Sequence, residues 1–166
     1  MTREGAHGIG ACEGVSRISQ LMSPSPITVK EAALVRDVLQ TMAIRRIRHI
    51  LVVDADGRLT GLVTHGDLTR PSRSGEARAD PSLHDLAVER VMRRQVATVG
   101  PDCCTGEAAR YMFRIKRGCL PVVDEDRRPT GIVTKADFLR EFMRAGAGCG
   151  CSVREDDWPR PSRLPA

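Results

Sequence analysis

Aromatic residues and lysine are scarce in this chain, which limits the polyanions that it is suited to bind. Phe, Tyr and Trp together make up 3% of the residues, and lysine occurs only at positions 30, 116 and 135. The net charge of +5 therefore rests on arginine, which is spread over the whole chain. Nucleic-acid binders combine a concentrated basic patch with aromatic rings that stack on bases. We therefore do not expect nucleic acid as a partner, and a nucleic-acid-binding protein that uses the arginine excess is kept as an alternative.

Long apolar runs and the common catalytic motifs are also missing. No run approaches the roughly 20 residues that cross a bilayer, and residues 1–14 hold no apolar segment typical of a signal peptide. The sequence contains no Gly-x-Ser-x-Gly elbow, no Walker loop and no His-Glu-x-x-His pair. We therefore expect a cytoplasmic protein that contacts no membrane, is not an enzyme and requires no cofactor for catalysis.

The six cysteines include no Cys-x-x-Cys pair, so the sequence predicts no metal site. In a cytoplasmic chain we expect them to be reduced, and Cys119 is expected to pack as a small apolar side chain. Cys149 and Cys151 lie in a Gly-rich tail. A redox or structural adaptor that acts through this tail is a second alternative, which exposed thiols without a role explain more simply.

What the sequence does contain is an internal repeat with an offset of 70 residues. The segment Thr64-His65-Gly66-Asp67 recurs as Thr134-Lys135-Ala136-Asp137, and the offset holds without a gap from about Ile18 to Arg70. The identical pairs include Met22/Met92, Thr28/Thr98, Val29/Val99, Met42/Met112, Val52/Val122, Val53/Val123, Asp54/Asp124 and Gly61/Gly131. A fixed period indicates a duplicated structural unit, and two copies are too few for a solenoid. We expect two units packed on each other as a pseudo-symmetric pair.

Each unit has the pattern of a β-α-β-β-α order. In the first, residues 27–29 form a short apolar segment, residues 34–42 have apolar side chains at helical spacing, and residues 50–53 and 59–63 are typical of strands. Residues 54–57 are typical of a turn, and Thr64 is placed to cap a following helix. In the second unit we expect a helix through residues 108–113, strands at 120–123 and 130–133, and a last helix through 138–142. The fold class is α/β or α+β.

The composition also predicts the limits of these units. We expect a flexible segment at 1–14, the first unit at 15–70, a linker at 71–82, the second unit at 83–145 and a flexible tail at 146–166. A short helix over residues 83–92 is expected to lead into the second unit.

The ordered motifs resemble the cystathionine β-synthase (CBS) domain family in its tandem form, the Bateman module. The resemblance rests on residues 118–124 and 130–137 and on their partners at 49–54 and 60–67, and it covers roughly residues 15–145. It implies a stand-alone regulatory protein that binds AMP, ADP, ATP or a related adenosyl ligand between the units and signals to an unknown protein partner. It also implies a homodimer. Leu51 and Arg48 replace the Pro121 and Gly118 of the second unit, so we expect the first site to bind differently or less well.

The chemistry of the repeated motif agrees with that implication. An aspartate at a helix start can accept hydrogen bonds from both hydroxyls of a ribose, and the free N–H groups there favour a phosphate. By the resemblance, ribose is assigned to Asp67 and Asp137 and phosphate to Thr64 and Thr134, with His65 and Lys135 beside it. The purine is expected beside Thr28 and Val29 or Thr98 and Val99, near Ile50 and Leu51 or Leu120 and Pro121. The simpler explanation is that Thr-x-x-Asp caps the helix, and the two roles are compatible.

Overall fold

The structure is a computed structural model that describes residues 16–69 and 84–145. The elements, in chain order, are α1 (Ile18–Leu21), β1 (Ser23–Pro24), β2 (Thr28–Lys30), α2 (Val35–Arg45), β3 (His49–Val53), β4 (Leu59–Thr64), α3 (His65–Thr69), the 3₁₀ helix η1 (Val88–Arg90), α5 (Thr105–Arg114), β5 (Cys119–Val123), β6 (Pro129–Thr134) and α6 (Lys135–Ala145). Strands and helices therefore alternate in two similar sets, which confirms the predicted α+β pair.

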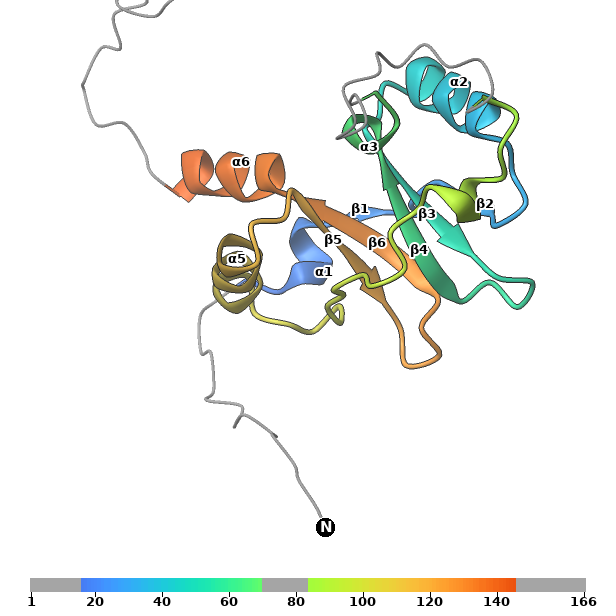
Figure 1. The fold of residues 1–166 in the computed structure, drawn as a ribbon. Helices are drawn as coiled ribbons and strands as arrows, with labels where there is room; N and C mark the ends of the chain where they lie inside the picture. Colours follow the sequence, from blue (N-terminus) through green and yellow to red (C-terminus); the bar gives the residue numbers. More distant parts are fainter. Residues whose placement is uncertain (1–15, 70–83, 146–166) are drawn as a thin grey trace, which may run out of the picture.

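Two small sheets form the centre of the molecule (Figure 1). In the first sheet β2 runs parallel to β3, which pairs with β4 as an antiparallel hairpin. In the second sheet β5 and β6 form the equivalent hairpin, and β1 pairs with β6. The counterpart of β2 is reduced to one parallel bridge between Val99 and Val122. The two hairpins share a register shift at the same place, between Val52 and Val53 and between Val122 and Val123.

Each unit also receives a segment that precedes the other unit in the sequence. β1 follows α1 near the start of the chain but pairs with β6, with Ser23 opposite Ile132. The equivalent segment after η1 pairs with β4, with Arg93 opposite Leu62. Glycine permits both approaches, because a Cβ at Gly131 would lie 2.9 Å from Cγ of Met22 and 3.2 Å from the carbonyl oxygen of Ser23. Gly61 is in the same position against Met92 and Arg93.

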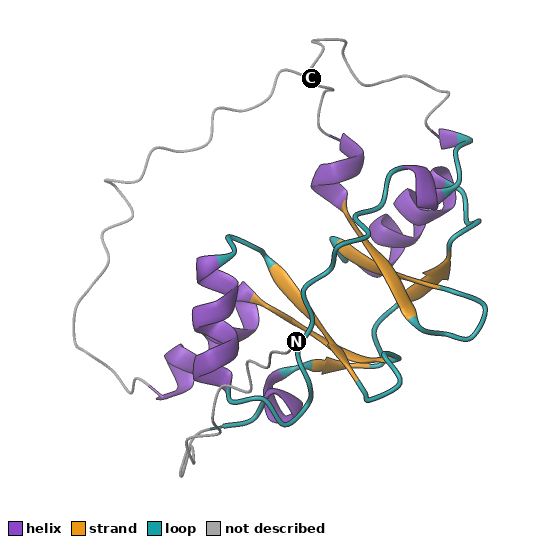
Figure 2. Cartoon of the chain, turned by 60° about the horizontal axis from the view of Figure 1, so that its bottom comes forward, coloured by secondary structure: helices purple, strands orange, loops and turns teal. Residues whose placement is uncertain are grey.

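Apolar packing divides into three clusters that match this arrangement. One lies between the first sheet, α2 and η1, and includes Val38, Met42 and Ile50. The second lies between the second sheet, α1 and α5, and includes Met112 and Leu120. The third joins the two sheets through Leu51, Leu59, Leu62 and Cys119. Figure 2 shows the outcome, with helices on the outer sides and strands between them.

One predicted helix is wrong. After a helical residue at His84 the described chain turns and then forms the three-residue η1, so no continuous helix covers residues 84–92. Backbone pairing prevents it, because Ala87 bridges to Leu34 and the N–H of Val88 donates to the carbonyl of Ala33 at 2.7 Å. The predicted segments 1–14, 71–82 and 146–166, including Cys149 and Cys151, lie outside the described residues. Among the described helices, none has the length and apolar character to span a membrane.

Candidate functional site

The first Thr-x-x-Asp motif begins α3 and makes the reciprocal contacts of a capping box. The backbone N–H of Asp67 donates to Oγ1 of Thr64 at 3.2 Å, and the backbone N–H of Thr64 donates to Oδ2 of Asp67 at 3.2 Å. The Thr64 hydroxyl also donates to Oδ2, at 2.7 Å. The other carboxylate oxygen, Oδ1, forms an ion pair with the guanidinium of Arg93. Both oxygens of Asp67 therefore have partners within the chain.

The second motif begins α6, which has 11 residues, and its carboxylate is held in the same way on one side. Oδ2 of Asp137 accepts hydrogen bonds from the backbone N–H and the hydroxyl of Thr134, both at 2.7 Å. Oδ1 pairs with Arg140 of the same helix at 2.9 Å. The side chain of Asp137 is 9% exposed and that of Arg140 is 66% exposed, so the carboxylate is fixed and its arginine partner is a surface residue.

A large cavity lies beside Asp137. It has a volume of about 550 Å³, which falls within the range of roughly 300–1,000 Å³ that is usual for ligand sites. Both units contribute to its wall, since β3 supplies His49 and Leu51 while α6 supplies Lys135 and Asp137. The remaining lining residues come from the segment 23–27, from 46–48 and from Gly118, Ile132, Thr134, Ala136 and Arg140.

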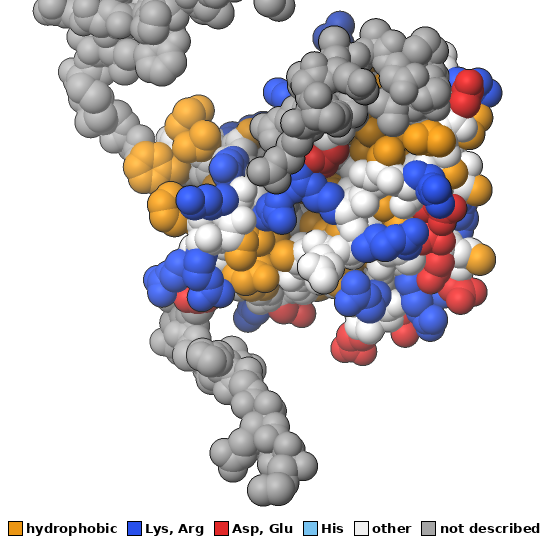
Figure 3. All heavy atoms as spheres, viewed as in Figure 1, with side chains coloured by type: hydrophobic (Ala, Val, Ile, Leu, Met, Phe, Trp, Pro, Cys, Tyr) orange, Lys and Arg blue, Asp and Glu red, His pale blue; other side chains and the backbone are white. Residues whose placement is uncertain are grey.

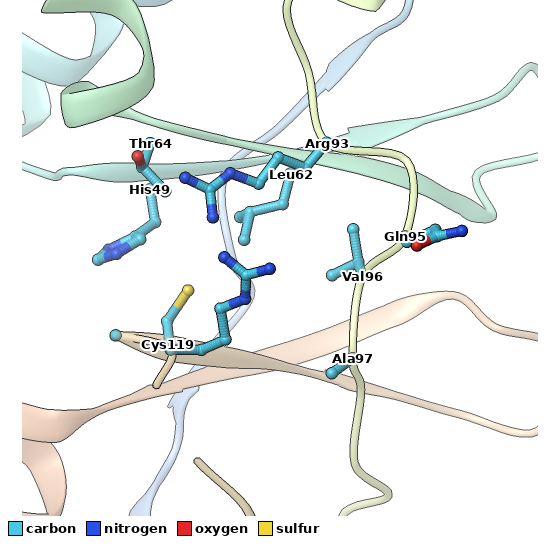
Figure 4. A pocket seen from close by; sticks show the side chains of 10 residues that line it. His49, Leu62, Thr64, Arg93, Gln95, Val96, Ala97 and Cys119 are labelled. Atoms are coloured by element: carbon cyan, nitrogen blue, oxygen red, sulfur yellow. The ribbon is translucent and has the colours of Figure 1, made fainter. Parts of the chain in front are cut away.

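The equivalent position beside Thr64 is a small cavity of about 50 Å³, enough for a few water molecules. Its lining includes Arg93, Gln95, Val96 and Ala97, which are the counterparts of Ser23, Ser25, Pro26 and Ile27 under the 70-residue offset. Figure 4 shows Arg93 reaching across Leu62 toward Thr64 and His49. Asp67 does not line this cavity, because Arg93 lies against it.

The environment changes the proton affinity of three groups at or next to these cavities. Burial raises the pKa of Asp67, but the hydrogen bonds from Thr64 and the charge of Arg93 outweigh it, so the net pKa lies below the ordinary value. Burial, followed by the charge of Arg48, lowers the pKa of His49, which is therefore neutral at pH 7. Burial raises the pKa of the Cys119 thiol to about 12, as expected for a packed and unreactive cysteine.

The structure brings some of the predicted site residues to the large cavity and leaves others elsewhere. Leu51, Thr134, Lys135 and Asp137 line it, and Thr64 lines the small one. The remaining predicted residues line neither cavity: Thr28, Val29, Ile50, His65, Asp67, Thr98, Val99, Leu120 and Pro121.

The alternation of a strand explains the difference between neighbours. Leu51 faces the other sheet, whereas Ile50 and Leu120 face the helices and belong to the cores. Val29 and Val99 also pack against those cores. Ile50, Leu120, Val29 and Val99 therefore face the apolar cores, whereas Leu51 lines the large cavity.

Sequence reasoning missed several residues of the cavity wall. Arg140, His49 and the segment 23–27 were not assigned to the site. Their position depends on the exchange of segments between units, which a motif does not reveal. The repeat did contain one signal of a difference between the two sites. The 70-residue offset aligns Ser23 with Arg93, directly after the identical pair Met22 and Met92.

The described residues contain no group of three or more His, Cys, Asp or Glu side chains arranged to hold a metal ion. The site chemistry of this part of the chain therefore consists of a fixed carboxylate, a helix start and several cations around an open space.

Comparison with known sequences identifies the repeat. The family model of the CBS domain matches residues 18–73 and again residues 88–144. A CBS domain-containing protein of Dictyostelium discoideum is 30% identical over 129 residues, which cover 74% of this chain and 88% of that protein. The homoserine O-acetyltransferase of Methanohalobium evestigatum is 32% identical over 123 residues, but these cover 74% of this chain and only 23% of the enzyme.

Solved structures show the same pairing of units. A CBS domain pair in complex with 5′-methylthioadenosine and S-adenosyl-L-methionine superposes with a TM-score of 0.68 at 27% identity, covering 80% of this chain and 99% of that one. The cytosolic domain of the Mg²⁺ channel MgtE in complex with ATP gives a TM-score of 0.63 at 32% identity, covering 75% of this chain and 48% of that one.

Proposed function

The chain belongs to the CBS domain family, and from this premise we propose that it is a regulatory module that binds an adenosine nucleotide in its large cavity. The observation that carries the proposal is the carboxylate of Asp137, buried on the wall of a cavity of about 550 Å³ at the start of α6. The catalytic activities of longer relatives are not transferred, because the chain covers only 23% of the acetyltransferase that it resembles.

Asp137 is suited to hold the ribose. Its carboxylate is fixed by two hydrogen bonds from Thr134, and its remaining lone pairs are able to accept the two hydroxyls of a sugar diol. Arg140 pairs with the same carboxylate from the surface side of α6 and is able to swing into solvent without a movement of the backbone. In this proposal Thr134 orients Asp137, because its single hydroxyl hydrogen is directed at the carboxylate.

The rest of the nucleotide has matching surroundings in the same cavity. Ile27, Leu51 and Ile132 offer an apolar wall for the purine. The positive end of the α6 dipole favours a phosphate at the start of the helix, and the side chains of Lys135 and Arg48 add positive charge.

The charge of the wall favours a phosphorylated ligand over a neutral nucleoside. Arg46, Arg48, Lys135 and Arg140 line the cavity, whereas Asp137 is the single carboxylate among the described residues that line it. A group of cations around one acid attracts anions and repels a cationic sulfonium. We therefore expect ATP and ADP to bind more tightly than 5′-methylthioadenosine or S-adenosylmethionine.

We propose that binding is converted into a signal through the two units. His49 and Leu51 belong to the first sheet and Asp137 to α6 of the second unit, so a ligand in contact with all three holds the units in one relative arrangement. A ligand that binds two arrangements unequally shifts the population toward the one that it favours. A partner protein is proposed to recognise that arrangement.

A homodimer is part of the proposal. α5 and α6 carry four large apolar side chains in solvent, with exposures of 84% for Phe113, 76% for Phe142, 71% for Met143 and 63% for Leu139. Hydrophobic atoms gather beside α6 on the face shown in Figure 3. A patch of this kind on a small protein marks an interaction surface, and a second copy offers a patch of the same chemistry.

The alternatives receive less support. On the face in Figure 3, basic side chains are scattered and interspersed with acidic ones, and they do not form the single stripe that a nucleic-acid binder presents. The cysteines of the proposed adaptor tail lie outside the described residues. The cytoplasmic location stays a prediction, which cell fractionation would test.

A thermal-shift panel tests the proposed function. AMP, ADP, ATP, GTP, 5′-methylthioadenosine and S-adenosylmethionine are compared at one concentration with the wild-type chain and with Asp137→Asn. Stabilisation follows mass action, so ATP and ADP should raise the melting temperature of the wild type most and should have little effect on the variant. No shift with any adenosine compound, or equal shifts in both proteins, would reject the proposal.

A further inference from the structure

We propose that Arg93 closes the first of the two equivalent sites, so that each chain binds one nucleotide, beside Asp137. This inference rests on the proposed function of the large cavity and adds which residue restricts binding to it. The two motifs themselves do not distinguish the sites, because in both the backbone N–H and the hydroxyl of the threonine donate to Oδ2 of the aspartate.

The difference lies on the exchanged segments that pass beside the motifs. Ser23 pairs with Ile132 on the second sheet, and Arg93 pairs with Leu62 at the equivalent place on the first sheet. A serine side chain leaves the space beside Asp137 open. The longer arginine side chain occupies the equivalent space beside Thr64, and the cavity there is reduced to about 50 Å³.

Arg93 also neutralises the carboxylate that a ribose would need. Its guanidinium pairs with Oδ1 of Asp67, while Oδ2 is held by Thr64. The side chain of Asp67 is 16% exposed, so removal of Arg93 would leave a mostly buried charge without its cationic partner. A nucleotide at this site would have to displace the guanidinium before its own hydroxyls could reach the carboxylate.

The backbone of Arg93 is fixed as well. Its N–H donates to the carbonyl of Leu62 and its carbonyl accepts from the N–H of Leu62, each at 3.0 Å. Arg140, which pairs with Asp137, also has its backbone held within a helix, but its side chain is 66% exposed, against 39% for that of Arg93. The first site is therefore closed by a residue held in place, whereas the second has only a movable surface partner.

The test is the stoichiometry of ATP binding to the full chain, measured by isothermal titration calorimetry. The wild type should bind one ATP per chain and Arg93→Ser, which copies Ser23, should bind two. The double variant Arg93→Ser, Asp137→Asn should keep one site. Arg94→Ser is the matched control, because Arg94 is the neighbouring exposed arginine and pairs with Glu31 and Glu89, and it should bind one ATP like the wild type.

Each outcome is decisive. Two sites in the wild type, or one site in both the wild type and Arg93→Ser, would overturn the closure by Arg93 and leave the proposed function intact. No binding by the wild type with one site in Arg93→Ser would reject the proposed function and support the closure. No binding by either protein would reject both. Should Arg93→Ser not fold, the wild-type stoichiometry and an unchanged affinity in Asp67→Asn decide the question without it.

Discussion

The starts of α3 and α6 hold an aspartate by the same contacts from a threonine, yet the space beside it measures about 50 Å³ in one unit and about 550 Å³ in the other. The sheets that carry the two helices have the same hairpin and the same register shift. What differs is the side chain that a neighbouring segment brings to the site, Arg93 in one unit and Ser23 in the other.

This comparison teaches that a binding motif and a binding site are separate properties of a duplicated fold. The motif sets the helix start and orients the carboxylate, which are local effects of a capping threonine. The cavity depends on the tertiary contact between a strand and a segment from the other half of the sequence. A duplicated chain is therefore able to keep both motifs for folding while using one of them for a ligand.

The largest expected effect tests whether the two sheets depend equally on a glycine that faces the exchanged segment. Gly61→Val and Gly131→Val should each lower the free energy of unfolding by about 3 kcal/mol, since a branched side chain would overlap Met92 or Met22 and crowd the paired backbone. Chemical denaturation measures both. Gly100→Ala is the control with little effect, because no atom lies within 4 Å of a Cβ at Gly100. A large loss of unfolding free energy in only one of the two valine variants would show that the two sheets are not equivalent.

The next effect separates the two carboxylates. Asp137→Asn should weaken ATP binding by about 2 kcal/mol, or roughly 30-fold, because hydrogen bonds to a charged acceptor are lost. Asp67→Asn should leave the affinity unchanged, since Arg93 lies between Asp67 and the small cavity. Calorimetric titration of both variants gives the comparison. A loss of affinity in Asp67→Asn would show that the first site is in use.

A third prediction compares the outer helices of the two units. Phe142→Glu should raise the dissociation constant of the dimer about tenfold, since a charge replaces an apolar contact of about 1.4 kcal/mol. Ile44→Glu on α2 should have a smaller effect, because Ile44 is the one large hydrophobic side chain exposed on that helix. Sedimentation velocity over a concentration series measures both. Wild-type chains that stay monomeric at high concentration would remove the proposed dimer.

The smallest effect concerns the ion pair that closes the first site. The pKa of folded Asp67 lies below its ordinary value of 3.8, so the unfolded chain binds the proton more readily. The resulting stabilisation is complete above pH 3.8 and is lost as the pH falls through the lower, folded pKa. The difference in unfolding free energy between the wild type and Asp67→Asn should therefore shrink on acidification from pH 7. A difference that does not change with pH would mean that Arg93 does not stabilise the charged form.

Much of this architecture is predictable from the sequence, because it depends on local patterns. Apolar runs such as residues 50–53 predicted β3 and β5, and the Thr-x-x-Asp motifs predicted the starts of α3 and α6. The repeat predicted that the two units pair. Each of these features follows from spacing within a few residues or from the offset between the copies.

The rest depends on contacts between distant segments. The helix expected over residues 83–92 is absent because Ala87 and Val88 bond to the backbone next to α2. The purine wall was assigned to Ile50 as well as Leu51, although one-residue steps along a strand alternate between faces. Arg93 was not recognised as part of a site because its distance from Asp67 in the sequence conceals their pairing.

The most direct test of the central claim is a crystal structure of the chain grown with ATP. We predict electron density for one nucleotide in the large cavity, with both ribose hydroxyls on the carboxylate of Asp137 and Arg93 still paired with Asp67. A nucleotide beside Asp67 with Arg93 displaced, or a ribose bound away from Asp137, would contradict the account.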